Sequence, residues 1–397
     1  MTRTKDTTFF ENKLLQFITE EDPLLAMLQW VADKLVEVEV AQKVNSLKGK
    51  HSKERTTYRC GTSVRRFDTR LGTRYMVIPK LRKGGYIPFF VTEKTRSEQA
   101  LIEVIQEAWK NGISTRKIDR VAKSLGIENI SASQVSEINK GLDDMVHEFR
   151  TRPLESEYPV LWVDALYEKI RNDTRVQNMA VQVVNGINKE GMPQILAVEP
   201  MENESEETYR VLFSKLKSRG LKTVWLCVSD AHKGLQAAIR KEFIGTSWQR
   251  CKVHFMRNIL AHVNQREKEK FASHLKQIWL EPDKESAVAC AERLISKYGK
   301  HFPQAIECLE NGLEDSLQFY EFPEIDHRKI ATTNSLERLN VEIRRRSRVI
   351  GIFPSIDSYA RLISSYLMEY EEDWQSGRTY INHEALAKQR VLLKLAA

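Results

Sequence analysis

Three carboxylates stand where the sequence could build a site for phosphoryl transfer. Asp164 follows the apolar run at 160–163, and Asp230 follows a second apolar run at 223–228. Glu337 falls in the first turn of a predicted helix. The carboxyl ends of parallel strands meet at one edge of a sheet, where α/β proteins place their sites. Two Mg²⁺ ions held by such oxygen ligands about 4 Å apart could stabilise the attacking and leaving oxygens of a phosphoryl transfer.

Each acid taken alone also has a structural explanation. Asp164 could end a strand, and Asp230 could cap the helix that follows it. Glu337 could be the cap partner of Asn334. On the individual residues both interpretations stay open, and the chemical one gains its weight from the combination of the three.

Positive charge is concentrated in one short segment. The 397 residues carry 62 Lys and Arg against 54 Asp and Glu, a net charge of +8. Nearly all of the surplus lies in residues 59–83, where Asp68 is the only acid. Concentrated positive charge attracts polyanions, so nucleic acid is the first partner to expect, and a solvated basic surface is the alternative. The DNA-binding candidates here are Arg65, Arg66, Arg70 and Arg74.

The composition argues against several classes of protein. No apolar run approaches the roughly 18 residues that a membrane span needs, so we expect no membrane partner. The N-terminus lacks the apolar segment and the cleavage site of a signal peptide. The five cysteines form no paired framework, which is typical of a reducing compartment. We therefore expect an unexported protein without disulfide bonds.

The region 1–56 is predicted to be helical. Asp22 and Pro23 are suited to the N-cap and first position of a helix. Apolar residues then recur at alternating steps of four and three, at Leu24, Leu28, Val31, Leu35 and Val38. This spacing predicts an amphipathic helix that could form a homodimer, and packing on its own domain is equally compatible. Residues 57–95 predict a small basic β segment.

Three short helices are predicted within 96–152. They begin near Ser97, Ser114 and Ser131, and the last start has the Ser131 and Gln134 pattern of a capping box. Short helices joined by tight turns are typical of helix-turn-helix proteins, although such cores also occur without DNA. Because the basic segment is adjacent, we interpret the region as DNA-binding. The candidate contacts are Arg116, Lys117, Ser133 and Gln134.

After residue 152 the pattern changes to strands. Three successive strands, then helix, strand, helix and strand, give a βββαβαβ order, which is the order of an RNase H-like sheet. The pattern of the following residues is helical throughout. We predict an α/β RNase H-like catalytic core over 153–254 and 326–397, with an all-α insertion at 255–325. A mainly helical DNA-binding region with a small basic β element precedes it.

Four sequence blocks resemble the signature blocks of mutator-type insertion-sequence transposases. They span 162–171, 228–235, 248–258 and 332–340, and they contain all three acids. The resemblance extends upstream through the blocks at 58–61, 68–70, 78–82 and 112–116, and so covers nearly the whole chain. One departure is Glu137, where we expect a basic residue in relatives.

The resemblance implies a DDE transposase with an RNase H-like core. It implies that Asp164, Asp230 and Glu337 bind two Mg²⁺ ions, for which Mn²⁺ can substitute. It implies binding of terminal inverted repeats and target DNA, strand cleavage and transfer, and a circular intermediate. The protein is then expected in the bacterial cytoplasm, associated with the nucleoid. An RNase H-like nuclease or resolvase, and a DNA-binding regulator with an inactive nuclease-like domain, are the alternatives.

Four further residues near the acids have two interpretations each. Cys251 and His254 resemble a family signature, but no second pair follows at zinc-finger spacing. We therefore expect no zinc and a packing or hydrogen-bonding role at the junction of strand and insertion. Trp248 could stack on DNA or belong to the core. His232 could orient a phosphate or begin a helix.

The predicted helix over 333–348 places its arginines at different angles around the helix axis relative to Glu337. At about 100° per residue, Arg344 and Arg348 fall on the side of Glu337, whereas Arg346 falls opposite. We predict that Arg344 and Arg348 contact DNA, and the alternative is that all three are solubilising charges. The predicted buried side is formed by Leu336, Leu339, Ile343 and Ile350.

Overall fold

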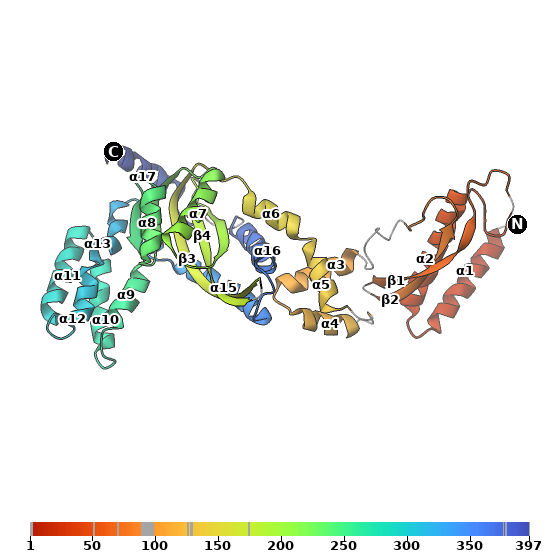
Figure 1. Cartoon of the computed structure of the whole chain (residues 1–397), viewed down its shortest axis with the longest axis horizontal. Coiled ribbons are helices and arrows are strands. Elements are labelled where there is room, and N and C mark those ends of the chain that lie inside the picture. The colour runs from red at the N-terminus through yellow and green to blue at the C-terminus, as the bar shows by residue number, and fades with distance from the viewer. Residues whose placement is uncertain are drawn as a thin grey trace. The chain divides into compact units, whose positions relative to one another are not determined.

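The computed structural model of the chain describes residues 3–50, 52–69, 71–88, 99–124, 127, 130–173, 175–375, 377 and 379–396. The chain divides into two units, 1–141 and 142–397, which are coloured from red to yellow and from yellow to blue in Figure 1. No helix within the described ranges is long and apolar enough to cross a membrane.

In the first half of unit 1, one helix packs on a β-hairpin and a second helix packs on the first. The elements of this half are α1 (Arg3–Ile18), α2 (Pro23–Val44), β1 (Arg59–Thr69) and β2 (Gly72–Leu81). As predicted, Asp22 caps α2 by accepting a hydrogen bond from the Leu25 backbone N–H at 3.1 Å. Buried Val36 and Val40 of α2 form a core with partly buried residues of the hairpin region. The predicted segments 1–56 and 57–95 therefore share one core.

The predicted apolar stripe of α2 lies outside this core. Leu24 is 64% exposed and Val38 is 56% exposed, and Leu28, Val31 and Leu35 are also exposed. The face that packs within the unit consists instead of Leu25, Val36, Val40 and Val44. The interpretation that the stripe packs on its own domain is therefore wrong, because a different face of the same helix does so.

The second half of unit 1 is a group of three helices in mutual contact. They are α3 (Gln99–Lys110), α4 (Thr115–Ser124) and α5 (Ala132–Lys140). The predicted capping box is present, since the Ser131 hydroxyl accepts from the Gln134 backbone N–H and the Gln134 side chain accepts from the Ser131 backbone N–H. The residues they bury include Leu101, Ile105, Ile118 and Val135.

The helix α6 (Asp143–Thr151) belongs to unit 2. It packs against α16 (Ile356–Gln375) and β5 (Pro193–Met201). Asp143 pairs with the buried guanidinium of Arg361. The division at Gly141 thus precedes α6, whereas the predicted boundary follows it at 152. The partners that attach α6 are distant in sequence, which is why the local pattern does not reveal them.

Unit 2 is built on a five-stranded mixed sheet. The other strands are β3 (Glu157–Asn172), β4 (Arg175–Ile187), β6 (Thr223–Ser229) and β7 (Ser247–Arg250), and the spatial order is β5-β4-β3-β6-β7. The β3–β4 and β4–β5 pairs are antiparallel, and the β3–β6 and β6–β7 pairs are parallel. With α7 (Glu206–Ser218) and α8 (Lys233–Glu242), the chain order is the predicted βββαβαβ.

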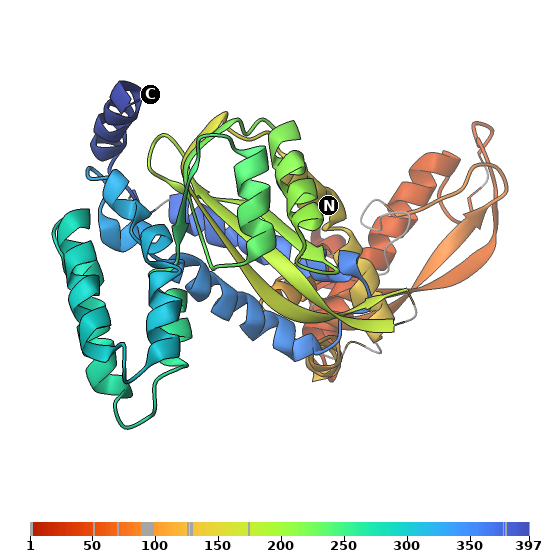
Figure 2. The same ribbon diagram turned by 60° about the vertical axis from the view of Figure 1, so that its left-hand side comes forward.

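The two faces of the sheet carry different helices, as Figure 2 shows. Leu161 and Val163 of β3 form a large core with α7 and α8. Successive side chains of a strand point to opposite faces. Trp162 accordingly points to the face covered by α15 (Asn334–Ile350) and α16, where its indole N–H donates to the Thr332 carbonyl at 3.1 Å. We call this second face the α15 face.

A helical block separates β7 from α15, where an all-α insertion was predicted over 255–325. Its elements are α9 (Lys252–Leu260), α10 (Lys268–Gln277), η1 (Ile278–Leu280), α11 (Lys284–Tyr298), α12 (Pro303–Glu310), α13 (Leu313–Ser316), η2 (Gln318–Glu321) and α14 (His327–Ile330). Buried Gln249 of β7 anchors the block, because its side chain donates to the Ser316 carbonyl and accepts from the Phe319 backbone N–H. After α16, the chain ends in α17 (His383–Ala396).

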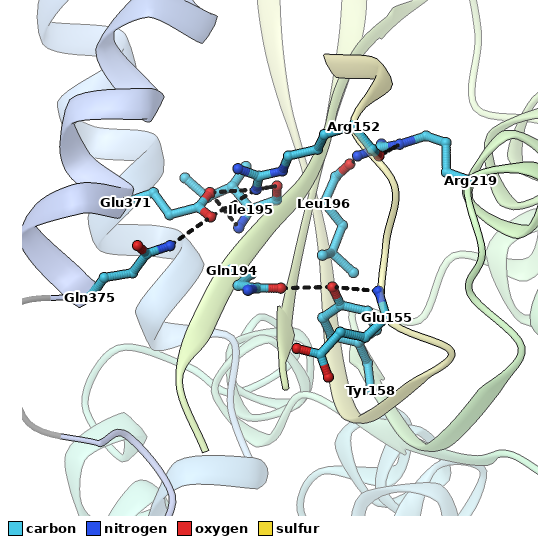
Figure 3. A network of polar contacts seen from close by, with 9 residues as sticks. All are labelled: Arg152, Glu155, Tyr158, Gln194, Ile195, Leu196, Arg219, Glu371 and Gln375. Atoms are coloured by element: carbon cyan, nitrogen blue, oxygen red, sulfur yellow. Dashed lines mark hydrogen bonds and ion pairs between the residues drawn. The ribbon is translucent and has the colours of Figure 1, made fainter. Parts of the chain in front are cut away.

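A network of polar contacts ties the end of α6 to the sheet and to α16 (Figure 3). Arg152 forms an ion pair with buried Glu371 at 2.7 Å and donates to the Ile195 carbonyl at 3.0 Å. Glu371 also accepts from the Ile195 backbone N–H at 3.2 Å. Arg219 reaches the same strand from the end of α7 by donating to the Leu196 carbonyl. The network fixes β5 and α16 relative to each other.

Candidate active site

Asp164 lies on β3, and Asp230 directly follows the end of the neighbouring parallel strand β6. The parallel β3–β6 register pairs Trp162 with Val228, and continuing it by two residues places Asp164 beside Asp230. We predicted that Asp164 follows the end of its strand. It lies instead in the middle of β3, because the antiparallel pairing with β4 continues to Asn172 after β6 has ended.

Asp164 is held in a largely buried position. The Asn340 side chain of α15 donates a hydrogen bond to its Oδ2 atom at 2.8 Å. The pKa of Asp164 is raised to about 6, mainly by burial; His254 opposes the rise, and the negative charges of Asp230 and Glu337 contribute smaller parts of it. The three predicted acids are therefore close enough to act on one another electrostatically.

Glu337 is positioned from the start of α15. Its backbone N–H donates to the Thr333 carbonyl at 2.9 Å. One carboxylate oxygen lies 3.4 Å from Nε2 of His254 and 4.0 Å from the Arg257 guanidinium of α9. The carboxylate is half-buried, so it remains within reach of solvent and of a ligand.

Cys251 and His254 join the end of β7 to the start of α15. The Thr333 backbone N–H and hydroxyl lie 3.4 and 3.3 Å from the Sγ atom of buried Cys251. Burial alone would raise the pKa of Cys251, but hydrogen bonds from His254 and Thr333 lower it overall. The hydrogen bond to Cys251 raises the pKa of His254, against the opposing effect of burial. The Nε2 atom of the same imidazole is the one that lies 3.4 Å from Glu337.

Trp248 is not available to DNA. It is 7% exposed and belongs to the core under α7 and α8, and its indole N–H donates to the Ser229 hydroxyl at 2.9 Å. The DNA-stacking interpretation is therefore wrong and the core interpretation is correct. His232 occupies the N-cap position of α8, with its ring centroid 5.6 Å from that of Tyr209.

The donor chemistry of the acids fits a hard cation. Asp164, Asp230 and Glu337 offer carboxylate oxygens, which Mg²⁺ prefers. As it stands, the part of the chain that the structure describes contains no group of three or more His, Cys, Asp or Glu side chains that could hold a metal ion. The carboxylates thus interact electrostatically, but in this arrangement they do not form a metal-binding cluster.

The arginines of the hairpin lie on both of its faces. Arg65 pairs with Met76 and Arg66 pairs with Tyr75 in the β1–β2 register, so the two side chains point in opposite directions. Arg66 forms an ion pair with buried Asp68 at 3.0 Å. Arg74 shares the face of Arg65 and is partly buried. Arg70 lies outside the described residues.

The candidate DNA contacts in the three-helix group differ in their exposure and in whether other hydrogen bonds already use their polar atoms. Arg116, Lys117 and Ser133 are exposed in the first turns of α4 and α5. The amide oxygen of Gln134 is already used in the capping box. Glu137 is exposed and pairs with Lys140 at 2.8 Å.

The arginines of α15 separate as the helical spacing predicts. Leu336, Leu339 and Ile343 are fully buried, and Ile350 is partly buried. Arg344 and Arg348 are exposed, and their charges lower the pKa of Glu168 against the larger, raising effect of its burial. Glu168 points to the same side of β3 as Asp164. Arg346 instead lies over the Tyr366 ring at 3.4 Å and pairs with Glu342.

The sequence reasoning did not single out Asn340. This residue follows Glu337 by one helical turn, at the end of the block 332–340. Residues three apart share a helix face. An amide side chain one turn after a candidate catalytic acid was therefore the feature of the sequence that could have identified this residue.

The comparison with protein families decides what the chain is. The family model described as "Transposase, Mutator family" matches residues 1–377. The chain belongs to this family. Curated members include the transposase for insertion sequence element IS256 in transposon Tn4001 of Staphylococcus aureus, which is 36% identical over 94% of this chain and 96% of its own length.

Two further relatives agree with the family. The transposase for insertion sequence element ISRM5 of Rhizobium meliloti is 34% identical over 99% of this chain and 98% of its own length. The transposase for IS1081 of Mycobacterium tuberculosis is 38% identical over 86% of this chain and 83% of its own length. The predicted resemblance to mutator-type insertion-sequence transposases is thereby confirmed.

Proposed function

We propose that the protein is a DDE transposase that cleaves and joins DNA strands with Mg²⁺. The observation that carries the proposal is that Asp230, directly after β6, and Glu337 of α15 both lie within electrostatic reach of Asp164 on the neighbouring strand β3. The strand order and the helical block before Glu337 support an RNase H-like core with an all-α insertion. Membership of a transposase family supports DNA as the substrate.

The carboxylates of Asp164, Asp230 and Glu337 would hold the metal, with Mn²⁺ as a possible substitute. Bound there, Mg²⁺ supplies activation of the attacking oxygen and neutralisation of charge on the leaving oxygen. Asn340 orients Asp164 through its 2.8 Å hydrogen bond. His254 lies beside Glu337, with its Nε2 atom 3.4 Å from a carboxylate oxygen. A freed 3′-hydroxyl would attack a second phosphodiester, giving strand transfer through a circular intermediate.

We place recognition of the terminal inverted repeats in unit 1. Its basic hairpin and three-helix group expose Arg65, Arg116 and Lys117. Such side chains neutralise phosphates and release counterions, which makes binding depend steeply on salt. Bases of the inverted repeats would be contacted from the start of α5, where Ser133 is exposed.

The protein is proposed to act as a homodimer joined through the α2 stripe. The stripe repeats at steps of four and three, which is the spacing of a seam between two helices, and all five side chains are exposed. Leu28→Glu combined with Leu35→Glu should give a monomer in sedimentation velocity, whereas exposed Lys34→Glu should not. Dimers that persist in the double variant would contradict this assignment.

The proposal is tested with duplexes that carry the two ends of the DNA flanking the gene. Asp164→Asn, Asp230→Asn and Glu337→Gln should each lower Mg²⁺-dependent cleavage and strand transfer by on the order of a thousandfold or more, with end binding kept. Exposed Glu310→Gln in α12 is the control with a matched change of charge. Near-normal joining by any of the three variants would remove that residue from the site. Cleavage without joining by the wild type would instead indicate a nuclease.

A further inference from the structure

A cavity of about 300 Å³ opens on the α15 face of unit 2. Its floor includes Trp162 of β3 and Asn185 of β4, and its walls include Arg338 of α15 and Tyr370 and Trp374 of α16. Tyr380, from the segment after α16, closes a further side. This volume is at the lower end of small-ligand sites, so it fits one planar ring system rather than a duplex.

Aromatic rings dominate the walls of the cavity. The Trp162 and Tyr380 rings lie 5.7 Å apart at 89°, and the Tyr370 and Trp374 rings lie 4.8 Å apart at 64°. Trp162 is fully buried, whereas the other three rings are partly exposed. A rigid floor with accessible rings around it suits the insertion of a flat, electron-rich ligand. Exposed Arg338 adds a cation to the lining, and exposed Asp373 adds an acid.

Asn185 contributes a buried amide to the lining of the cavity. It is 1% exposed, and its Oδ1 atom has no hydrogen-bond partner among the residues that the structure describes. The β4–β5 register is irregular between Val184 and Asn185, and such bulges often re-aim a side chain next to a site. Buried amides are normally satisfied, and an amide can both donate and accept. The edge of a nucleobase offers the complementary groups.

The cavity is adjacent to the proposed catalytic acids. Trp162 and Asp164 point to the same face of β3 and are roughly 6.6 Å apart along the strand. Arg338 directly follows Glu337 in α15. A base in the cavity could therefore belong to a nucleotide at or next to the phosphate that the acids engage.

We infer that this cavity binds one unpaired nucleobase of the DNA strand that is cut, stacked among the aromatic rings and hydrogen-bonded by Asn185. This inference rests on the proposed function. Moving a base out of the duplex costs its pairing and stacking, and a stacking pocket offsets that cost. The pocket would hold the strand end in place while its phosphate reacts.

The test is the affinity for end duplexes measured without divalent metal, so that no cleavage is required. One mismatch is placed in turn at each position around the cleavage site. Wild-type protein should bind at least fivefold more tightly when one particular position is unpaired, because the cost of unpairing is already met. Trp374→Ala and Asn185→Ala should each remove this preference, Trp374→Phe should keep most of it, and exposed Glu372→Ala is the control.

Three outcomes separate the possibilities. If the wild type cleaves the paired ends with Mg²⁺ but prefers no mismatch, the inference is overturned and the proposed function stands. If the wild type cleaves nothing, the proposed function fails, whatever the mismatch preference. If adenosine monophosphate quenches the tryptophan fluorescence of DNA-free protein, and mismatched DNA does not compete with it, the cavity takes a free nucleotide and a base from the cut strand is excluded.

Discussion

The two faces of the five-stranded sheet are made by alternate residues of the same strands, yet they differ in kind. On the α7 and α8 face, Leu161 and Val163 join a continuous apolar core. On the α15 face lie Trp162, Asp164 and Glu168, whose polar partners come from α15 and from Thr332 just before it. The apolar core keeps the strands rigid. On the α15 face, the same rigid strands can therefore hold charged side chains at positions where their burial is unfavourable.

The largest predicted change is a loss of stability on breaking the buried ion pair between Arg152 and Glu371 on the α15 face. Arg152→Ala leaves the buried carboxylate of Glu371 without its cation, which should lower the free energy of unfolding by about 3–5 kcal/mol. The double variant Arg152→Met with Glu371→Leu should regain most of this loss, since no buried charge remains. Leu212→Met on the apolar face should cost less than about 1.5 kcal/mol.

Urea unfolding of the four proteins measures these differences. If the two faces differ in this way, Arg152→Ala should be the least stable of the four proteins. If the double variant is as unstable as Arg152→Ala, the hydrogen bonds of the network to β5 would outweigh the buried charge.

The next prediction concerns how the protonation of Asp164 changes the stability of the protein. The pKa of this residue is about 6 in the folded protein, mainly because of burial, against an ordinary value of 3.8. Protonation therefore contributes stability that is fully present below pH 3.8 and is lost as the pH rises through about 6. Asp164→Asn removes the charge and can still accept from Asn340. Without metal it should be more stable than the wild type at pH 8, by on the order of 3 kcal/mol.

The check is the unfolding free energy of both proteins across this pH range in a chelating buffer. The two curves should coincide below pH 4, diverge between pH 4 and about 6, and stay a constant distance apart at higher pH. Curves that stay parallel would mean that Asp164 is not destabilised by burial, and the contrast between the faces would lose its electrostatic part.

A smaller effect is expected at Asn340, which we assign as a positioning residue. Asn340→Ala leaves all three acids in place but frees Asp164 to rotate. Loss of such a supporting hydrogen bond typically costs 10–100-fold in metal affinity or activity. The Mg²⁺ concentration for half-maximal cleavage should therefore rise, with unchanged end binding. Exposed Val341→Ala is the control, and an unchanged Mg²⁺ requirement for Asn340→Ala would argue against the assignment.

Local signals predicted much of this molecule, and distant partners explain the rest. The caps at Asp22 and Ser131 and the order of the strands follow from short-range patterns. The buried side of α15 follows from its helical period. The position of Asp164 within β3 depends on pairing with β4, which an apolar run cannot reveal. The burial of Trp248 likewise depends on which helices cover its strand.

The α2 stripe and α6 show the same limit. Both faces of α2 carry apolar residues, so periodicity alone did not indicate which one packs within the unit. The position of α6 is fixed by Asp143 with Arg361 and by Arg152 with Glu371, pairs that join segments far apart in the chain. Asn185 gave no signal in the sequence, because its unpaired oxygen is a property of the folded sheet.

The smallest effect should appear at the outer edge of the α15 face. Arg344 and Arg348 are exposed near Glu168, whereas Arg346 is only 14% exposed, stacked on Tyr366 and paired with Glu342. If the α15 face meets DNA, Arg344→Ala and Arg348→Ala should each weaken binding and reduce its salt slope by about one unit, the value for one lost phosphate contact. Arg346→Ala should leave the slope unchanged and lower stability instead, because its guanidinium is occupied within the protein. Equal slopes for all three variants would mean that DNA does not approach along this side of α15, and the polar character of the α15 face would then serve only the acids and the cavity.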